Sequence, residues 1–268
     1  MPEGTRLETK KMKARMSIAP VAAAAAAGMI SGCASSQPQP CSKDLAGPPE
    51  VQAVYVQDDL VIDGRLDEQV WKTAPVYALA LCADRATAGD ILQEAGTARF
   101  AWNERYFYMA IEFTDSDVVA EGEKDGEHHY TKGDLAELFL WPEQHSWYWE
   151  LYVTPHNLQT SFFFPGPGRI LPSCFQNHLD LKVASQVQGT FNDWSDRDQG
   201  WTAEMAVPVS ELTRRGEAWG PGAAWRILVG RYNYSVHLPK FELSAMPALS
   251  KTSYHLRNEY ARLALVKP

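Results

Sequence analysis

The fold of this chain is decided by the stretch Tyr130-Thr-Lys-Gly-Asp-Leu-Ala-Glu-Leu-Phe-Leu-Trp-Pro142. Side chains alternate between the two faces of a β-strand. One face is therefore predicted to carry Ala136, Leu138 and Leu140, and the other Leu135, Glu137, Phe139 and Trp141. A buried carboxylate without a partner is strongly disfavoured. Glu137 is thus predicted either to pair with a neighbouring strand or to line a concave face and accept hydrogen bonds from a ligand.

Further strand-like runs flank this stretch. Asn103-Glu104-Arg105 predicts a hairpin, and Pro155-His156-Asn157 predicts a turn within a three-strand meander. Helical turns are predicted at Leu66–Trp71, capped by Asp67, and at Pro208–Leu212. The predicted strands are two short ones within Val54–Ile62, then Thr97–Trp102, Tyr106–Phe113, Asp134–Trp141, Trp147–Thr154, Leu158–Phe164, Leu179–Val187, Trp201–Val207, Trp225–Tyr234 and Tyr260–Val266. Many short strands with almost no helix predict an all-β, antiparallel sandwich.

The alternation also predicts which strand faces form the core. Trp147 and Trp149 share a face with Leu151 and Val153, so they are predicted to be core residues rather than a binding platform. The opposite face carries Tyr148, Glu150, Tyr152 and Thr154. A later strand is predicted to turn inward Trp201, Ala203, Met205 and Val207.

The N-terminus has the order of a secretory signal. Basic residues between Lys10 and Arg15 precede an apolar run, Met16–Ile30, which contains six consecutive alanines. Ile30-Ser31-Gly32-Cys33 follows and resembles the lipobox of bacterial lipoproteins, in which the cysteine is lipidated. An ordinary signal with a chance cysteine and an Ala-rich membrane anchor are the alternatives, although the run is short for a spanning helix.

These features divide the chain into three parts. Residues 1–32 are predicted to be a signal peptide, and residues 33–50, rich in Ser, Gln and Pro, a flexible tether that begins at lipidated Cys33. Residues 51–268 are predicted to form one domain. The predicted location is therefore the periplasmic face or outer surface of a bacterial membrane, to which the exported protein is held by its lipid.

Charge and cysteine content restrict the possible partners. Removing residues 1–32 takes away five basic and two acidic groups from 25 and 33, which leaves a net charge of about −11. Such a surface argues against nucleic acid as a partner. Cys41, Cys82 and Cys174 permit one disulfide without defining its pairing, and their spacing does not predict a zinc site.

An ordered set of short motifs extends from Val54 to the C-terminus. The set comprises Ile62-Asp63-Gly64 with Leu66-Asp67-Glu68 and Trp71, Trp102-Asn103 with Tyr106-Phe107-Tyr108, Thr114-Asp115-Ser116-Asp117, Gly133-Asp134 with Glu137-Leu138-Phe139, Trp201-Thr202-Ala203-Glu204 with Val207-Pro208, Trp225-Arg226 with Arg231, and Tyr260 with Leu263. Together they resemble the family 9 carbohydrate-binding module and related DOMON-like domains of bacterial surface lipoproteins. No single motif is specific to this family, but the order of the whole set is.

This resemblance implies a jelly-roll β-sandwich that holds a sugar between two aromatic side chains. The first aromatic corresponds to Tyr130, the hydrogen-bonding carboxylate to Glu137, and the second aromatic to Tyr254. Arg231 and His255 are predicted to assist. Pyranose C–H faces pack on aromatic rings while their hydroxyls need charged or amide partners, so this set suits a sugar.

The sequence departs from the family at several of these positions. Glu150 stands where a sugar-contacting arginine is expected, and Arg231 where an aspartate is expected. One interpretation is that the two exchange charge roles in a site of altered specificity. The other is that they form a cross-strand salt bridge and the site no longer binds sugar.

The family also implies structural calcium. Asp115 and Asp117 are the predicted ligands, since calcium prefers hard oxygen donors. The alternative is a solvated acidic loop, because the spacing is not that of an EF-hand. No other cofactor is predicted.

The predicted function is non-catalytic, lipid-anchored binding of a sugar or polysaccharide for capture or carbohydrate catabolism, with a glycoside hydrolase as a possible partner. Four alternatives remain. The same sandwich could bind haem through Met246 with His255 or His237, act as a structural envelope protein, serve as a hydrolase accessory, or hydrolyse glycosides itself. Glu137, Glu150 and Glu204 are available for hydrolysis, but the sequence gives no reason to pair them.

Overall fold

The computed structural model describes residues 48–176 and 178–268. The predictions for the signal peptide, lipidated Cys33 and Cys41 lie outside these residues. The described residues belong to one compact unit. Its first strand, β1, spans Glu50–Tyr55.

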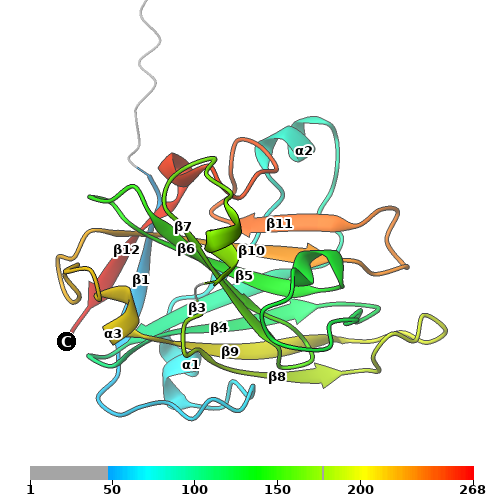
Figure 1. Cartoon of the computed structure of the whole chain (residues 1–268). Coiled ribbons are helices and arrows are strands. Elements are labelled where there is room, and N and C mark those ends of the chain that lie inside the picture. The colour runs from blue at the N-terminus through cyan, green and yellow to red at the C-terminus, as the bar shows by residue number, and fades with distance from the viewer. Residues whose placement is uncertain (1–47, 177) are drawn as a thin grey trace, which may run out of the picture. The chain divides into compact units, whose positions relative to one another are not determined.

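The described residues fold almost entirely into strands, which confirms the predicted all-β class (Figure 1). The remaining strands are β2 (Tyr77–Ala78), β3 (Gly96–Trp102), β4 (Tyr106–Thr114), β5 (Leu135–Pro142), β6 (Tyr148–Val153), β7 (Gln159–Phe164), β8 (Lys182–Gln188), β9 (Gly200–Pro208), β10 (Trp225–Asn233), β11 (Glu242–Met246) and β12 (Ala261–Val266). The helices are α1 (Gln69–Thr73), α2 (Ala83–Thr87) and α3 (Val209–Leu212), and the 3-10 turns are η1 (His129–Thr131), η2 (Pro172–Gln176) and η3 (Arg257–Glu259).

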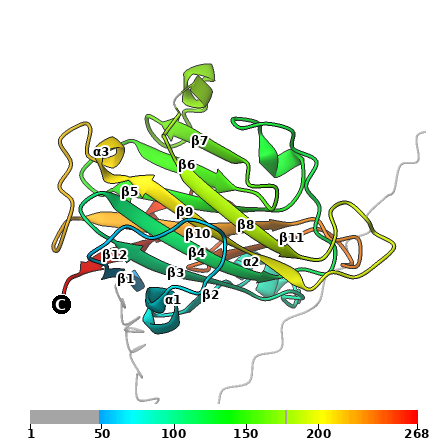
Figure 2. The ribbon, with the colours of Figure 1, turned by 90° about the horizontal axis from the view of Figure 1, so that it is seen from below.

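The strands form two facing layers that belong to one hydrogen-bonded sheet (Figure 2). The strand order is β7-β6-β5-β10-β12-β1-β3-β4-β9-β8, with β11 paired to β10 and β2 to β3. The first layer contains β5, β6, β7, β10 and β11, and the second layer contains β3, β4, β8 and β9. β1 departs from the antiparallel prediction, because it pairs in parallel with both β12 and β3.

Apolar side chains fill the space between the layers. Ala136, Leu138 and Leu140 of β5 lie in this core, as predicted, with Trp147 and Trp149 beside β6. Trp201, Ala203, Met205 and Val207 of β9 meet them from the other layer. The alternate residues of β5 form a second apolar cluster on the outer face of the first layer, with members that include Leu135 and Phe139.

The segment after β1 differs from its prediction. No strand pair forms within Val54–Ile62, because β1 ends at Tyr55 and the chain turns away along the second layer. The Glu204 carboxylate fixes this segment by accepting hydrogen bonds from the Asp63 and Gly64 amides, both at 3.0 Å, and from the Trp71 indole at 2.7 Å. The predicted helical turn forms slightly later than expected, with Glu68 rather than Asp67 at its N-cap.

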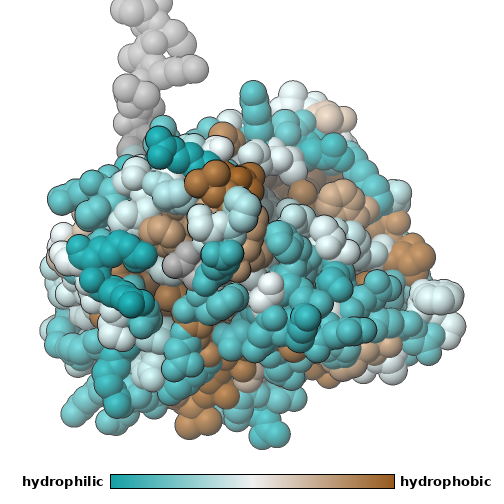
Figure 3. All heavy atoms as spheres, in the orientation of Figure 1, coloured by the Kyte–Doolittle hydropathy of each residue, from teal (hydrophilic) through white to brown (hydrophobic). Residues whose placement is uncertain are grey.

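The α-helices of the described residues are short, with five residues or fewer. Among residues 48–176 and 178–268, no helix is long and apolar enough to cross a bilayer. The face shown in Figure 3 is largely hydrophilic, with separate apolar patches. Cys82 and Cys174 are both buried free thiols.

Candidate functional site

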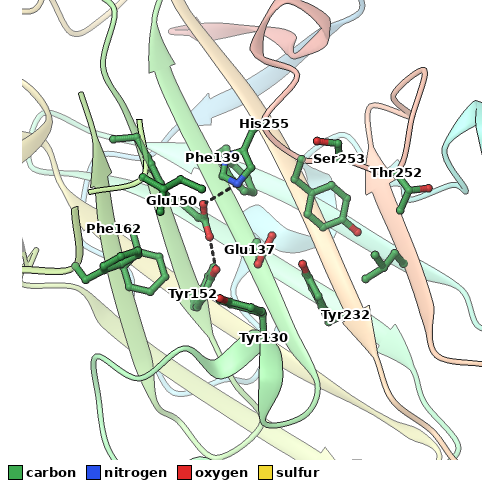
Figure 4. A pocket seen from close by; sticks show the side chains of 15 residues that line it. Tyr130, Glu137, Phe139, Glu150, Tyr152, Phe162, Tyr232, Thr252, Ser253 and His255 are labelled. Carbon is green, nitrogen blue, oxygen red and sulfur yellow. Dashed lines mark hydrogen bonds and ion pairs between the residues drawn. The ribbon is translucent and has the colours of Figure 1, made fainter. Parts of the chain in front are cut away.

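A cavity of about 290 Å³ opens on the outer face of the first layer, on the side away from the interlayer core. We call it the Glu137 cavity. Figure 4 shows Glu137 near its centre, between Glu150 and Tyr152 on one side and Tyr232 on the other. The cavity is lined by Tyr130, Glu137, Phe139, Glu150, Tyr152, Phe162, Phe164, Ile170, Phe175, Tyr232, Leu243, Thr252, Ser253, Tyr254 and His255.

Two carboxylates share one wall because of the strand register. On the paired strands β5 and β6, Glu137 is opposite Tyr152 and Phe139 is opposite Glu150, so all four side chains project from the same face. The Tyr152 hydroxyl donates a short hydrogen bond to Glu150 Oε1 (Figure 4). Glu150 Oε2 is buried without a hydrogen-bond partner. This wall therefore presents an acceptor that the protein does not satisfy.

Burial makes Glu137 and Glu150 weaker acids than they are in water. Burial raises the pKa of Glu150 to about 7, opposed by the hydrogen bond from Tyr152. Burial raises the pKa of Glu137 well above its usual value, and the neighbouring Glu150 charge adds to that increase. Both shifts favour the protonated form of the carboxyl groups.

His255 lies at the rim of the cavity. Its Nε2 is 3.8 Å from Glu150 Oε2, and its Nδ1 is 2.8 Å from the Tyr148 hydroxyl. Burial lowers the pKa of His255. The neutral imidazole is thus favoured, and it leaves Glu150 without a full compensating charge.

The two predicted clamp tyrosines line the same cavity, but a third ring lies between them. The Tyr232 ring centroid is 6.2 Å from that of Tyr130 and 5.9 Å from that of Tyr254. Tyr254 is nearly buried, and its hydroxyl donates to the carbonyls of Arg231 at 3.0 Å and Ser244 at 2.8 Å. Tyr254 therefore forms a fixed wall, while Tyr130 is half-exposed at the mouth.

The structure does not bring Arg231 to the cavity, contrary to the sequence prediction. Its side chain points to the other face of β10, where it lies 3.1 Å from Asp115 and 3.7 Å from Glu94. β5 also separates β10 from β6, so Arg231 cannot pair across strands with Glu150. The exchange of charge roles within one site and the cross-strand salt bridge are both wrong, because the two residues occupy opposite faces of the sheet.

Asp115 and Asp117, the predicted calcium ligands, have protein partners. Asp115 accepts hydrogen bonds from Arg231 and from the Asp117 amide, and Asp117 accepts one from the Val236 amide at 2.8 Å. In the described part of the chain, the acidic groups that converge closely enough to suggest a metal are instead Asp63, Glu68 and Glu204. Glu204 already binds the backbone and the Trp71 indole. The predicted calcium is untested by this geometry.

The structure also separates the residues considered for haem. Met246 packs in the interlayer core, whereas His255 lies on the outer face of the first layer. His237 lies elsewhere, with its Nε2 3.0 Å from the Asp196 carbonyl. The residues do not converge into a pair of axial ligands.

Sequence reasoning missed Tyr152, Tyr232 and Phe162 as cavity residues. The alternation on this strand predicts that Tyr152 and Glu150 share one face, and this shared face indicates that Tyr152 lines the cavity beside Glu150. Tyr232 follows Gly230 by two residues and so shares the face that meets Glu137. Phe162 comes from β7, whose alignment with β6 depends on the turn between them and cannot be read from composition.

Comparison with known proteins agrees with this architecture. The structure of a proposed carbohydrate-binding protein from Bacteroides uniformis superposes with a TM-score of 0.62 at 13% identity, covering 82% of this chain and 100% of that one. A family 9 carbohydrate-binding module from Caldicellulosiruptor kristjanssonii gives a TM-score of 0.53 at 11% identity both with cellotriose and with glucose, covering 82% of this chain and 94% or 96% of the other. At these identities the likeness concerns the fold. The search of curated proteins found no significant match.

The sequence gives a more direct assignment. Residues 62–220, more than half of the chain, match the model of one family, "Carbohydrate family 9 binding domain-like". The motifs named from Ile62 to Glu204 all fall inside the matched range. The chain belongs to the carbohydrate family 9 binding domain-like family.

Proposed function

We propose that this domain binds the end of a carbohydrate chain in the Glu137 cavity without cleaving it. The observation that carries the proposal is the convergence of Glu137 and Glu150 with the rings of Tyr130, Tyr232 and Tyr254 on one hollow. Carboxylates accept hydrogen bonds from sugar hydroxyls, and aromatic walls pack against C–H faces. The volume, about 290 Å³, suits a small ligand such as a terminal sugar unit.

A second cavity supports a ligand longer than one sugar. This cavity, which we call the Phe241 cavity, has a volume of about 590 Å³ and shares Leu243 and Thr252 with the Glu137 cavity. Phe241 is about half-exposed there and stacks near Tyr232, with centroids 6.5 Å apart and planes at 27°. A chain whose terminal unit enters the Glu137 cavity can therefore continue across Phe241.

The charges of the Phe241 cavity favour an uncharged continuation of that chain. Lys240 and Arg85 both pair with Asp90, at 2.8 and 2.7 Å. Asp84 accepts hydrogen bonds from Thr252 at 2.9 and 2.8 Å. Glu242, which also lines this cavity, accepts hydrogen bonds from the Gln93 and Glu94 amides. The charged lining side chains are thus three acids and two bases, a balance that does not attract an acidic polymer.

Export and lipid anchoring complete the proposed role. The lipobox-like Cys33 and the preceding apolar run support attachment to a bacterial membrane by acyl chains. A glycoside hydrolase that degrades the captured polymer is the proposed partner. Cys33→Ala is expected to release the protein into the soluble fraction, whereas retention of the variant in membranes would contradict the anchor.

Structural calcium, held by Asp115 and Asp117, is part of the same proposal and follows from the family. Calcium that binds only the folded state raises its melting temperature. Thermal unfolding of the EDTA-treated protein is expected to shift upward when calcium is returned, but not when magnesium is added. Identical thermal unfolding curves with and without calcium would contradict calcium binding.

Sugar binding is tested by screening the purified protein against a glycan panel and titrating each hit by calorimetry. We expect a hit whose affinity falls about tenfold or more in Glu137→Gln, since a charge-assisted hydrogen bond is lost. Glu112→Gln is the matched control, because Glu112 is exposed on β4 in the other layer. Absence of binding to every glycan would contradict the proposal, and release of reducing sugar would contradict its non-catalytic part.

A further inference from the structure

The Glu137 cavity has an excess of negative groups. Its ionisable side chains are two glutamates, one histidine and four tyrosines. Within the part of the chain that the structure describes, no lysine or arginine lines it. A site built only to bind neutral hydroxyls needs one acceptor carboxylate and gains nothing from a second one placed beside it, since like charges repel.

The nearest arginines are engaged elsewhere. Arg231 is buried on the opposite face of β10 with Asp115 and Glu94. Arg257 lies over the Trp141 ring, 4.4 Å from its centroid, and donates to the Ser146 carbonyl at 2.6 Å. His255 is the one lining group that can become cationic, and burial lowers its pKa. The protein therefore leaves the carboxylate pair without a permanent counter-charge.

One carboxylate oxygen, Glu150 Oε2, has no hydrogen-bond partner among the described residues, and His255 Nε2 lies 3.8 Å from it. Glu150 is 5% exposed, and its Oε2 accepts no hydrogen bond, while Oε1 is bound by Tyr152. An unsatisfied buried acceptor is costly unless a ligand supplies the missing donor. Since Glu150 lines the cavity, a ligand group that enters it can provide that donor.

Aromatic rings surround the same carboxylates. Tyr232 stands beside Glu137, Tyr130 stands beside Tyr152, and Phe139 stands near Glu150 (Figure 4). Tyr254 and Phe162 line the same cavity. The faces of such rings attract cations, most strongly where water is excluded. Acidic groups enclosed by aromatic rings form a binding site suited to an organic ammonium.

We propose that the sugar recognised in the Glu137 cavity is a hexosamine with a free amino group, whose ammonium binds between Glu137 and Glu150. The inference rests on the proposed sugar-binding function and specifies its ligand. The ammonium donates hydrogen bonds to both carboxylates, and the C–H face of the ring packs on the tyrosines. An N-acetylated or neutral sugar offers no charge for this pair.

The binding step has a definite proton balance. Without ligand, burial favours the protonated form of a carboxyl group in this pair. When the ammonium enters, it replaces that proton, which leaves to solvent, so the net charge of the site is unchanged. The titratable or charged groups that face the pair or its neighbours are Tyr148, Tyr152, His255, Tyr254, Tyr232, Tyr130, Tyr234, Tyr260, His128, Cys174 and Arg257. Tyr152 already donates a hydrogen bond to Glu150, and His255, whose Nε2 is 3.8 Å from Glu150 Oε2, is the lining group that can become cationic, so the proton count must also be measured in His255→Gln.

The test is calorimetric titration of the purified protein with matched sugars. Glucosamine and galactosamine are compared with glucose, galactose and the two N-acetylhexosamines, both as monosaccharides and as β-1,4-linked trisaccharides. We expect one amino sugar to bind at least about tenfold more tightly than its neutral and acetylated counterparts. Its binding is expected to release protons near pH 7, measured from the heats in buffers of different ionisation enthalpy, and His255→Gln is expected to preserve this release.

Glu150→Gln separates the inference from the proposed function. The amide keeps the shape and removes the charge, so the ratio of the affinity for the amino sugar to that for the neutral sugar is expected to fall towards one in the variant. Glu112→Gln is expected to leave both affinities unchanged. Equal affinities in the wild type, or a preference for the acetylated form, would overturn the amino-sugar inference alone. Failure to bind any sugar, neutral or amino, would overturn both claims.

Discussion

Gly230 and Tyr254 are in direct contact, and the missing side chain of the glycine creates the space for the ring. A Cβ added at Gly230 would lie 2.6 Å from Cε2 and 2.8 Å from Cδ2 of Tyr254. Gly230 is also the register partner of Glu137 on β5. The glycine therefore lets the Tyr254 ring lie against the sheet beside the Glu137 carboxylate, which forms one wall of the cavity.

Gly230→Ala is expected to move the Tyr254 ring and to reduce sugar affinity. Overpacking at a buried site costs about 1–3 kcal/mol of stability, and displacement of the wall changes the cavity as well. The checks are thermal unfolding and calorimetric titration with the best-binding glycan. Gly166→Ala is the control, since a Cβ there meets nothing closer than the Arg169 side chain at 3.7 Å. Unchanged affinity in Gly230→Ala would show that the Tyr254 position is unimportant for binding.

Arg231→Met is expected to destabilise the fold without changing the intrinsic affinity for sugar. Removal of the guanidinium leaves Asp115 and Glu94 buried without their cation, which costs about 3–5 kcal/mol. Arg226→Met on the same strand removes the more exposed pair with Glu143 and is expected to cost about 1 kcal/mol or less. Denaturant unfolding measures both. Similar losses in the two variants would contradict the role assigned to the buried pair.

The pH dependence of stability is expected to report on Glu150. Burial raises the pKa of Glu150 from 4.5 to about 7, so the native state binds its proton more tightly than the unfolded state does. This contribution is complete below pH 4.5 and is lost as pH rises to about 7, so the free energy of unfolding falls across that window.

Comparison with Glu150→Gln isolates this contribution. His129 and His255 have lowered pKa values because of burial, and their effect on stability has the opposite sign, rising with pH through about 6.5. Since both histidines are present in both proteins, the difference in unfolding free energy between variant and wild type should widen in favour of the variant between pH 4.5 and 7. A constant difference across this range would mean that Glu150 has an ordinary pKa.

Phe241→Ala is expected to distinguish long ligands from short ones. Phe241 lines the second cavity and not the first, so its ring would contact a second or later sugar unit. Loss of a stacking ring should weaken binding of a trisaccharide by about threefold or more and leave a monosaccharide unaffected. Phe191→Ala, which removes another exposed ring outside both cavities, is the control. An equal loss for both ligand lengths would contradict the continuation across Phe241.

The alternation of residues predicted much of the fold. On β5 it separated the core residues from Glu137 correctly, and on β6 it placed Glu150 and Tyr152 on one face. It did not predict β11, because Glu242–Met246 is short and mixes polar with apolar residues. α2 was missed for a similar reason, since five residues with one acid and one base carry no clear helical period.

The arrangement of the site depended on neighbours that are distant in sequence. Arg231 is predicted at the cavity because it stands where the family resemblance expects an aspartate, whereas its phase on β10 places it on the core side with Val229. Its partner Asp115 comes from the loop after β4, in the facing layer. That pairing arises from the packing of two layers, which strand periodicity in one segment does not encode.

The most direct test of the account is a crystal structure of the protein with its best-binding sugar. The sugar is predicted to lie in the Glu137 cavity, with an oxygen or nitrogen atom about 3 Å from the Glu137 carboxylate and ring carbons about 4 Å from Tyr232 or Tyr130. A sugar bound elsewhere on the domain, with the Glu137 cavity free of it, would contradict the central claim.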